Sequence, residues 1–215
     1  EIHMKIKKEI EAIRPEVIEL RRDFHRHPEL GFKEFRTSGI VKDYLESLDL
    51  DEVHTCSGTG VIGILKGGKP GKRVILRADI DALPIQEDSG EPFASENPGI
   101  AHACGHDGHT AMLLGAAKIW AAHRAEIPGT LVFLFQPNEE DAGAQIMIDD
   151  GAMEITGKPD AIFGYHLWAN FPLGKIGIHP GPTMASSYYF KIKIHGKGGH
   201  GGEPQPDTDP DHTVD

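Results

Sequence analysis

Residues 102–110 form the densest group of reactive side chains in the sequence. They read His-Ala-Cys-Gly-His-Asp-Gly-His-Thr, so nine residues hold one thiol, three imidazoles and one carboxylate. Thiolate, imidazole and carboxylate are the ligands that borderline-soft divalent metal ions take. Cys104 and His106 are close enough to share one ion or to bridge two. An isolated Cys-x-His pair is commonly coincidental, but the density of ligand types around this one predicts a metal-dependent hydrolase.

The other polar side chains of this run are expected to support the site instead of binding metal. Imidazole ligands need partners that orient them, so we expect His102 and His109 to pack or to orient the ligands.

A second acidic cluster, Gln-Pro-Asn-Glu-Glu-Asp, occupies residues 136–141. Adjacent carboxylates such as Glu139 and Glu140 are commonly just solvated surface charge. Here they follow the apolar run 131–135, so water is expected to be partly excluded. One carboxylate could then bind a metal ion while the other stays free as a base, because a carboxylate near a dication remains ionised.

Three further residues are candidates with alternatives that the sequence leaves open. Asp81 is either a cap at a strand end or a carboxylate that steadies the metal site, and we favour the second. His166 closes a predicted strand, where a ligand role is expected although a lone histidine there is more often a packing residue. His200 lies among four glycines, so it either contacts substrate or is incidental to a flexible loop.

Alternating helical and strand patterns predict an α/β fold with a mixed, largely parallel sheet flanked by helices. Apolar spacing of three and four predicts a helix over residues 5–27 that Pro15 splits in two. Further helices are expected at 37–48, 108–123 and 143–150. Strands are expected at 60–65 and 73–78, joined as a hairpin, and at 131–135 and 161–166. Ligands gather beyond the carboxyl ends of strands in such sheets, where Asp79, Asp81, Glu139, Glu140 and His166 all fall.

The pattern changes near Thr183, which predicts a domain boundary there. Residues 4–183 would form the N-terminal part of a catalytic domain. Residues 184–215 would begin an α+β lid or dimerisation domain that the chain does not complete. The alternation of Phe190, Ile192 and Ile194 with polar residues predicts a strand with one buried face.

Composition excludes several classes of partner. The formal net charge of −11 argues against nucleic acid, which requires a basic face. No apolar run approaches the roughly 18 residues that span a bilayer. The sequence also shows no charged segment followed by an apolar one of the kind that directs secretion. The two cysteines, Cys56 and Cys104, are too few for a disulfide framework. A cytoplasmic location is therefore expected.

The sequence resembles the metal-dependent aminoacylase and carboxypeptidase superfamily, in particular its amidohydrolase branch. That branch includes hippurate hydrolases, N-acyl-amino-acid amidohydrolases and auxin-conjugate hydrolases. The resemblance rests on six blocks: Leu-Arg-Arg-Asp-Phe-His-Arg-His-Pro-Glu-Leu (20–30), Arg-Ala-Asp-Ile-Asp-Ala-Leu-Pro (77–84), His-Ala-Cys-Gly-His-Asp-Gly-His-Thr (102–110), Phe-Gln-Pro-Asn-Glu-Glu (135–140), Gly-Tyr-His-Leu (164–167) and Gly-Lys-Gly-Gly-His-Gly (196–201).

The resemblance implies a metallopeptidase-like catalytic domain with two divalent metal ions. Zinc, manganese, cobalt and nickel all suit the ligands. Cys104 would bridge the two ions, and three further residues would complete the set: His106, Glu140 and His166. Glu139 would be the general base, and His200 would bind substrate from the lid, commonly across a homodimer or higher homo-oligomer.

The implied reaction is hydrolysis of the amide bond of N-acyl amino acids or related small amides by a metal-activated water. The alternatives are a carboxypeptidase or dipeptidase of the same superfamily, or a truncated, non-catalytic metal-binding remnant. The resemblance also implies that a last histidine ligand lies beyond Asp215. His212 is in the wrong context to replace it.

Overall fold

The computed structural model describes residues 2–186, 190–193 and 195. The chain divides into two compact units, residues 1–169 and 170–215. The described residues of the second unit contain no helix or strand. The strand predicted at 190–194 is therefore wrong for 190–193, whose apolar residues Phe190 and Ile192 are exposed with no strand beside them in the described part. Residue 194 lies outside the described residues, and the predicted boundary near Thr183 stays a prediction.

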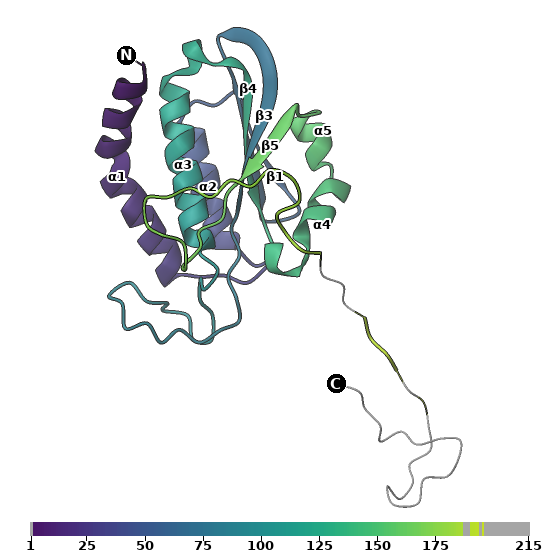
Figure 1. Ribbon diagram of the computed structural model, residues 1–215. Helices are drawn as coiled ribbons and strands as arrows, with labels where there is room; N and C mark the ends of the chain where they lie inside the picture. The colour runs from purple at the N-terminus through teal and green to yellow at the C-terminus, as the bar shows by residue number, and fades with distance from the viewer. Residues whose placement is uncertain (1, 187–189, 194, 196–215) are drawn as a thin grey trace, which may run out of the picture. The chain divides into compact units, whose positions relative to one another are not determined.

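The first unit is a five-stranded mixed sheet flanked by helices, as predicted. The strand order is β1-β2-β4-β3-β5, with β4 and β5 parallel to β3, and β2 antiparallel to both β1 and β4. Helices α1, α2 and α3 lie on one side of the sheet and α4 and α5 on the other (Figure 1). The strands are β1 (Glu52–Cys56), β2 (Gly60–Lys66), β3 (Lys69–Asp79), β4 (Pro128–Gln136) and β5 (Ala161–Gly164). The helices are α1 (Ile2–Arg26), α2 (Phe35–Ser47), α3 (His106–Ala122), α4 (Gly143–Asp149) and α5 (Ala152–Thr156), with short 3-10 turns η1 (Arg124–Glu126) and η2 (Glu139–Asp141).

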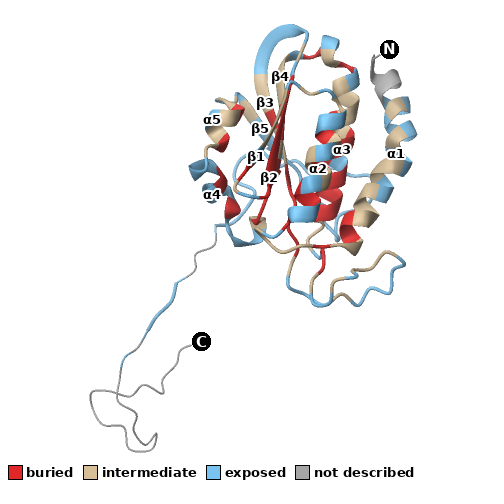
Figure 2. Cartoon of the chain, turned by 180° about the vertical axis from the view of Figure 1, so that it is seen from behind, coloured by how far each residue is buried: buried red, intermediate tan, exposed pale blue. Residues whose placement is uncertain are grey.

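The core lies on both faces of the central strands, which explains the continuous apolar run in β4. Val132 packs in the cluster that includes Met147 of α4. Phe133 packs in the larger cluster on the side of α1, α2 and α3. Figure 2 shows buried residues concentrated along these central strands and on α3. A strand covered on both faces has no solvent side, so its sequence need not alternate.

The predicted hairpin between β2 and β3 is wrong, because β4 lies between them. The connection from β2 to β3 instead crosses the beginning of β4, where the Gly67 N–H donates to the Gly129 carbonyl at 2.8 Å. The antiparallel neighbour of β2 on its other side is β1, which the sequence analysis did not predict. The short, mostly polar sequence of β1, Glu-Val-His-Thr-Cys, carries little strand signal.

The predicted break at Pro15 is also wrong, because α1 runs through it without interruption. Pro15 removes one hydrogen bond within the helix, but it is exposed, as is Glu11 one turn earlier. Water can therefore satisfy the carbonyl that loses its partner. Val17 and Leu20 pack against the core, which holds the helix in line. No helix among the described residues is long and apolar enough to cross a membrane.

A buried histidine, His123, ties α1 to the end of α3. It donates from Nδ1 to Glu126 at 2.9 Å and from Nε2 to Glu9 at 2.6 Å. The hydrogen bond that His123 donates to Glu126, and then the one that it donates to Glu9, raise the pKa of His123. Because the folded-state pKa is raised, the stabilisation is complete below the ordinary histidine pKa of about 6.5 and is lost as pH rises through the raised value.

We therefore expect His123→Gln to lower the free energy of unfolding most at acidic pH. The measurement is thermal or denaturant unfolding of both proteins over a pH series. The difference between them should shrink as the pH rises above about 6.5. A difference that grows with pH would contradict the assignment.

Candidate metal centre

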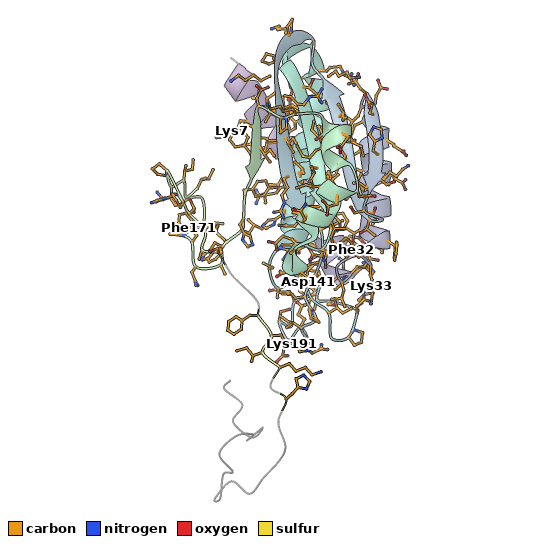
Figure 3. The ribbon with its side chains drawn as sticks, turned by 90° about the vertical axis from the view of Figure 1, so that its right-hand side faces the viewer. Lys7, Phe32, Lys33, Asp141, Phe171 and Lys191 are labelled. Atoms are coloured by element: carbon orange, nitrogen blue, oxygen red, sulfur yellow. The ribbon has the colours of Figure 1, made fainter. Side chains whose placement is uncertain are left out.

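The candidate residues gather at one end of the sheet in the first unit. β3, β4 and β5 are parallel, so their carboxyl ends meet at the same edge. Asp79 is the last residue of β3, η2 follows β4 closely, and His166 lies two residues beyond β5. α3 begins there at His106. Figure 3 shows Asp141, the last residue of η2, at the same end as Phe32 and Lys33.

Three of the predicted ligands come together: Cys104, His106 and His166. The Cys104 sulfur is 3.3 Å from Nε2 of His166, and one ligand atom from each of the three lies within 4.8 Å of the others. Gly105, between the first two, has a φ of 87°. This left-handed conformation favours glycine, and Gly105 lies directly before the start of α3.

The predicted acidic pair joins the same group through His106. A carboxylate oxygen of Glu139 and one of Glu140 each lie 3.8 Å from Nε2 of His106. Both glutamates are partly exposed, whereas His106 is fully buried. The structure therefore brings together all five residues predicted for the metal site and the base: Cys104, His106, Glu139, Glu140 and His166.

The two histidines are held in the orientation that a metal ligand needs. Nδ1 of His106 donates to the Asp81 carbonyl at 2.9 Å, and Nδ1 of His166 donates to the Leu167 carbonyl at 2.6 Å. Metal-binding histidines characteristically donate their second ring nitrogen in this way, which leaves the lone pair of the other nitrogen free. Nε2 of His106 is buried and has no hydrogen-bond partner. A divalent cation fits this orphaned nitrogen.

The charges at the site also fit a cation. Burial, then the hydrogen bond and charge of Glu140 and the charge of Glu139, raise the pKa of the Cys104 thiol to about 12. Burial alone would lower the pKa of His106, but the hydrogen bond to Asp81 and the nearby Asp79 raise it overall. The same carboxylates that favour the protonated forms of the Cys104 thiol and the His106 ring would also attract a dication, which would replace those protons.

Asp81 steadies the site, as the favoured alternative predicted. Its carboxylate lies 3.2 Å from Nδ1 of His106 and accepts the backbone N–H of Glu140 at 3.1 Å. Asp81 is only 1% exposed, so its carboxylate interacts with neighbouring protein groups and not with solvent. One residue thus orients a predicted ligand on α3 and fixes the backbone of another in η2.

Asp79 and His109 form a linked pair in the site. Nδ1 of His109 donates to Asp79 at 2.6 Å, and Nε2 of His109 accepts the backbone N–H of Leu167 at 2.8 Å. Burial would raise the pKa of Asp79, but the His109 hydrogen bond and the Arg77 charge lower it to about 2. With both nitrogens engaged, His109 orients the segment that carries His166, which agrees with the orienting role expected for it.

Two other polar residues of the 102–110 run differ from each other: Asp107 has charged partners on α1, whereas neither ring nitrogen of the buried His102 has a hydrogen-bond partner. Asp107 accepts from Arg21 and from His25, each at 2.7 Å, which fastens the start of α3 to α1. His102 belongs to none of the possible metal groups among the described residues, and burial lowers its pKa to about 4. The predicted substrate-binding residue His200 and the histidine at 212 lie outside the described residues.

The chain matches a known protein family and several of its members. Residues 75–214 match the model of peptidase family M20/M25/M40. An N-acyl-L-amino acid amidohydrolase of Geobacillus stearothermophilus is 47% identical over 95% of this chain and 55% of its own length. Thermostable carboxypeptidase 2 of Saccharolobus solfataricus is 44% identical over 96% of this chain and 53% of its own length.

A solved structure extends the likeness to three dimensions. The YXEP protein of Bacillus subtilis, described as a dinuclear metal binding peptidase from the M20 family, aligns with a TM-score of 0.75 and 43% identity. The alignment covers 80% of this chain and 48% of that one. The chain therefore spans about half the length of the relatives it matches.

Proposed function

Because this chain belongs to peptidase family M20/M25/M40, we propose that the protein containing it is a binuclear metal-dependent amidohydrolase. Its substrates are N-acyl amino acids or related small amides. The relatives named above are hydrolases of amide or peptide bonds by name, and one solved relative is described as dinuclear. The observation that carries the proposal is Nε2 of His106, a buried nitrogen without a hydrogen-bond partner. It lies 3.7 Å from a carboxylate oxygen of Asp79 and 3.8 Å from one of Glu139 and one of Glu140.

Four residues would hold the ions, with the thiolate as the bridge: Cys104, His106, Glu140 and His166. Any of zinc, manganese, cobalt or nickel suits this ligand set. Two divalent cations bound there would polarise the substrate carbonyl and lower the pKa of a water molecule. Asp81 and His109 keep the ligands aligned through the contacts described above.

Glu139 is the general base of the proposal. Its carboxylate reaches to 3.8 Å from Nε2 of His106 and is partly exposed, so it borders the ligand cluster while open to solvent. A carboxylate in this position takes a proton from the attacking water and then delivers it to the nitrogen of the leaving amine.

The lid, the oligomer and the compartment complete the proposal. His200 would bind substrate and stabilise the oxyanion from a lid domain that begins after Thr183, in a homodimer or higher homo-oligomer. A thiolate ligand requires a reduced cysteine, and both Cys56 and Cys104 are free thiols. These points favour the cytoplasm.

A carboxypeptidase or dipeptidase activity is the second candidate. The 44% identity to a thermostable carboxypeptidase is close to the 47% identity to the amidohydrolase. Sequence identity to these relatives therefore does not decide between the two kinds of substrate, one with an acyl group and one with an aminoacyl group on the amino side of the scissile bond.

The test is a substrate panel on the full-length protein, before and after removal of metal by a chelator. We expect N-acetyl and N-benzoyl amino acids to be cleaved faster than dipeptides. We also expect the chelated protein to lose activity and to recover it when a divalent cation is added back, because the nucleophile depends on the ions. Faster cleavage of dipeptides would favour the second candidate.

The 215-residue chain measured beside the full-length protein would address the third alternative. Metal binding by both without hydrolysis by either would indicate a non-catalytic metal-binding protein.

A further inference from the structure

We propose that Glu34 is a positioning residue for the general base, a role that rests on the function proposed above. Glu34 lies just before α2 and is fully buried, with 0% of its surface exposed. It is neither a predicted ligand nor part of any possible metal group among the described residues. A buried carboxylate is unfavourable unless it is hydrogen-bonded. Its partners therefore indicate what it does.

The carboxylate of Glu34 holds the turn that leads into Glu139. One oxygen accepts the backbone N–H of Asn138 at 2.9 Å, and the other accepts the hydroxyl of Thr59 at 2.6 Å. Asn138 has a φ of 51°, a left-handed conformation that non-glycine residues keep only when the surrounding structure holds them in it. Glu34 supplies that support to the residue directly before the proposed base.

A second carboxylate holds the other side of the base. Asp81 accepts the backbone N–H of Glu140 at 3.1 Å. Residues 138 and 140 are thus each fixed by a buried carboxylate, and Glu139 lies between them. The backbone on either side of Glu139 is therefore held by hydrogen bonds, on one side to the chain before α2 and on the other to the chain after β3.

The segment before α2 also contacts the same turn directly. Gly31 leaves no room for a side chain, because a Cβ there would lie 1.8 Å from the side-chain oxygen of Asn138. In the same segment, the Glu29 carbonyl accepts the backbone N–H of Ala82 at 2.8 Å. Residues 29–34 therefore contact both the turn that contains Asn138 and the chain after β3 that contains Asp81 and Ala82. Phe32 and Lys33 lie at the same end of the unit as Asp141 (Figure 3).

The test compares Glu34→Ala with Glu34→Gln in the full-length protein. Glutamine is nearly isosteric, and its oxygen can still accept the Asn138 N–H while its amide donates to Thr59. We expect Glu34→Ala to lower kcat by about a hundredfold, as small misplacements of catalytic groups do, with KM changed little. Glu34→Gln should restore most of the loss.

Glu29→Ala is the matched control. Glu29 is another carboxylate of the same segment, and it accepts the backbone N–H groups of Arg36 and Thr37 at 3.0 and 2.8 Å. Its side chain supports the start of α2 and not the turn, and Glu29→Ala keeps the backbone carbonyl that accepts the Ala82 N–H. We expect Glu29→Ala to lower thermal stability while kcat stays close to that of the unmodified protein. An equal loss of kcat in the control, or no loss in Glu34→Ala, would overturn the positioning role.

Metal binding separates failure of this inference from failure of the proposed function. Glu140 lies in the same turn, so titration of the metal-free protein with Zn²⁺ should show an affinity about 10- to 100-fold weaker in Glu34→Ala. Glu29→Ala and Glu34→Gln should bind Zn²⁺ nearly normally. This pattern would support the role of Glu34 even if no amide substrate were cleaved. Unchanged Zn²⁺ affinity in Glu34→Ala would overturn the role independently of activity.

Discussion

Replacing Glu139 with glutamine is expected to lower kcat of the full-length protein by about 10²- to 10⁴-fold, the range that general acid–base catalysis contributes. Glutamine keeps the shape of the side chain but cannot accept a proton from water. Metal content should stay near normal, because the proposed ligand set does not include Glu139. The measurements are steady-state kinetics with an N-acyl amino acid and elemental analysis of the purified variant.

Asp141→Asn is the matched control for that variant. Asp141 ends the same turn, η2, and is exposed, so its loss tests the effect of removing one negative charge from the turn. We expect near-normal kcat. Metal loss together with activity loss in Glu139→Gln would mean that Glu139 is a ligand, and its assignment as the base would be wrong.

Replacing Cys104 with serine is expected to weaken metal binding strongly. Loss of a residue that only orients a ligand lowers metal affinity by about 10- to 100-fold, and loss of a ligand itself should lower it by more. A serine hydroxyl is a poor anionic bridge at neutral pH, whereas a thiol loses its proton readily to a bound cation. Titration with Co²⁺ measures the affinity. The sulfur-to-cobalt charge-transfer absorption in the near ultraviolet should appear in the unmodified protein and disappear in the variant.

Cys56→Ser provides the control for removal of a thiol. Cys56 is buried at the end of β1, where its sulfur contacts the carbonyl of Met147 and belongs to no possible metal group among the described residues. The cobalt absorption should persist in this variant. Unchanged metal stoichiometry and affinity in Cys104→Ser would count against the bridging role.

Elements with strong local patterns could be predicted from the sequence alone. The helix expected at 37–48 is α2 (Phe35–Ser47), and the apolar run at 131–135 lies within β4. The errors concern tertiary pairing. Nothing in the residues around the β2–β3 connection reveals that a strand beginning only at Pro128 lies between β2 and β3. The local effect of Pro15 predicts a break, whereas its exposure and the packing of Val17 and Leu20 against the core keep α1 continuous.

In the candidate site, too, local sequence features could be predicted and contacts between distant segments could not. Residue types and positions at strand ends were enough to select Cys104, His106 and the acidic pair. Partners that depend on three-dimensional neighbours were not visible. Glu34 and Asn138 are 104 positions apart, and His109 accepts its hydrogen bond from Leu167, 58 positions away. The position of Asp79 at the end of a predicted strand places it near the site, but the hydrogen bond that it accepts from His109 is not visible in the sequence.

The candidate ligands come from separate segments: the start of α3, the η2 turn and the chain after β5. None of these segments can present its ligand until the sheet has brought the others alongside. A cation captured by all of them would act as a cross-link that exists only in the native state, and its binding free energy would add to folding by mass action. Metal supply would then govern how long the protein survives in the cell as well as how fast it works.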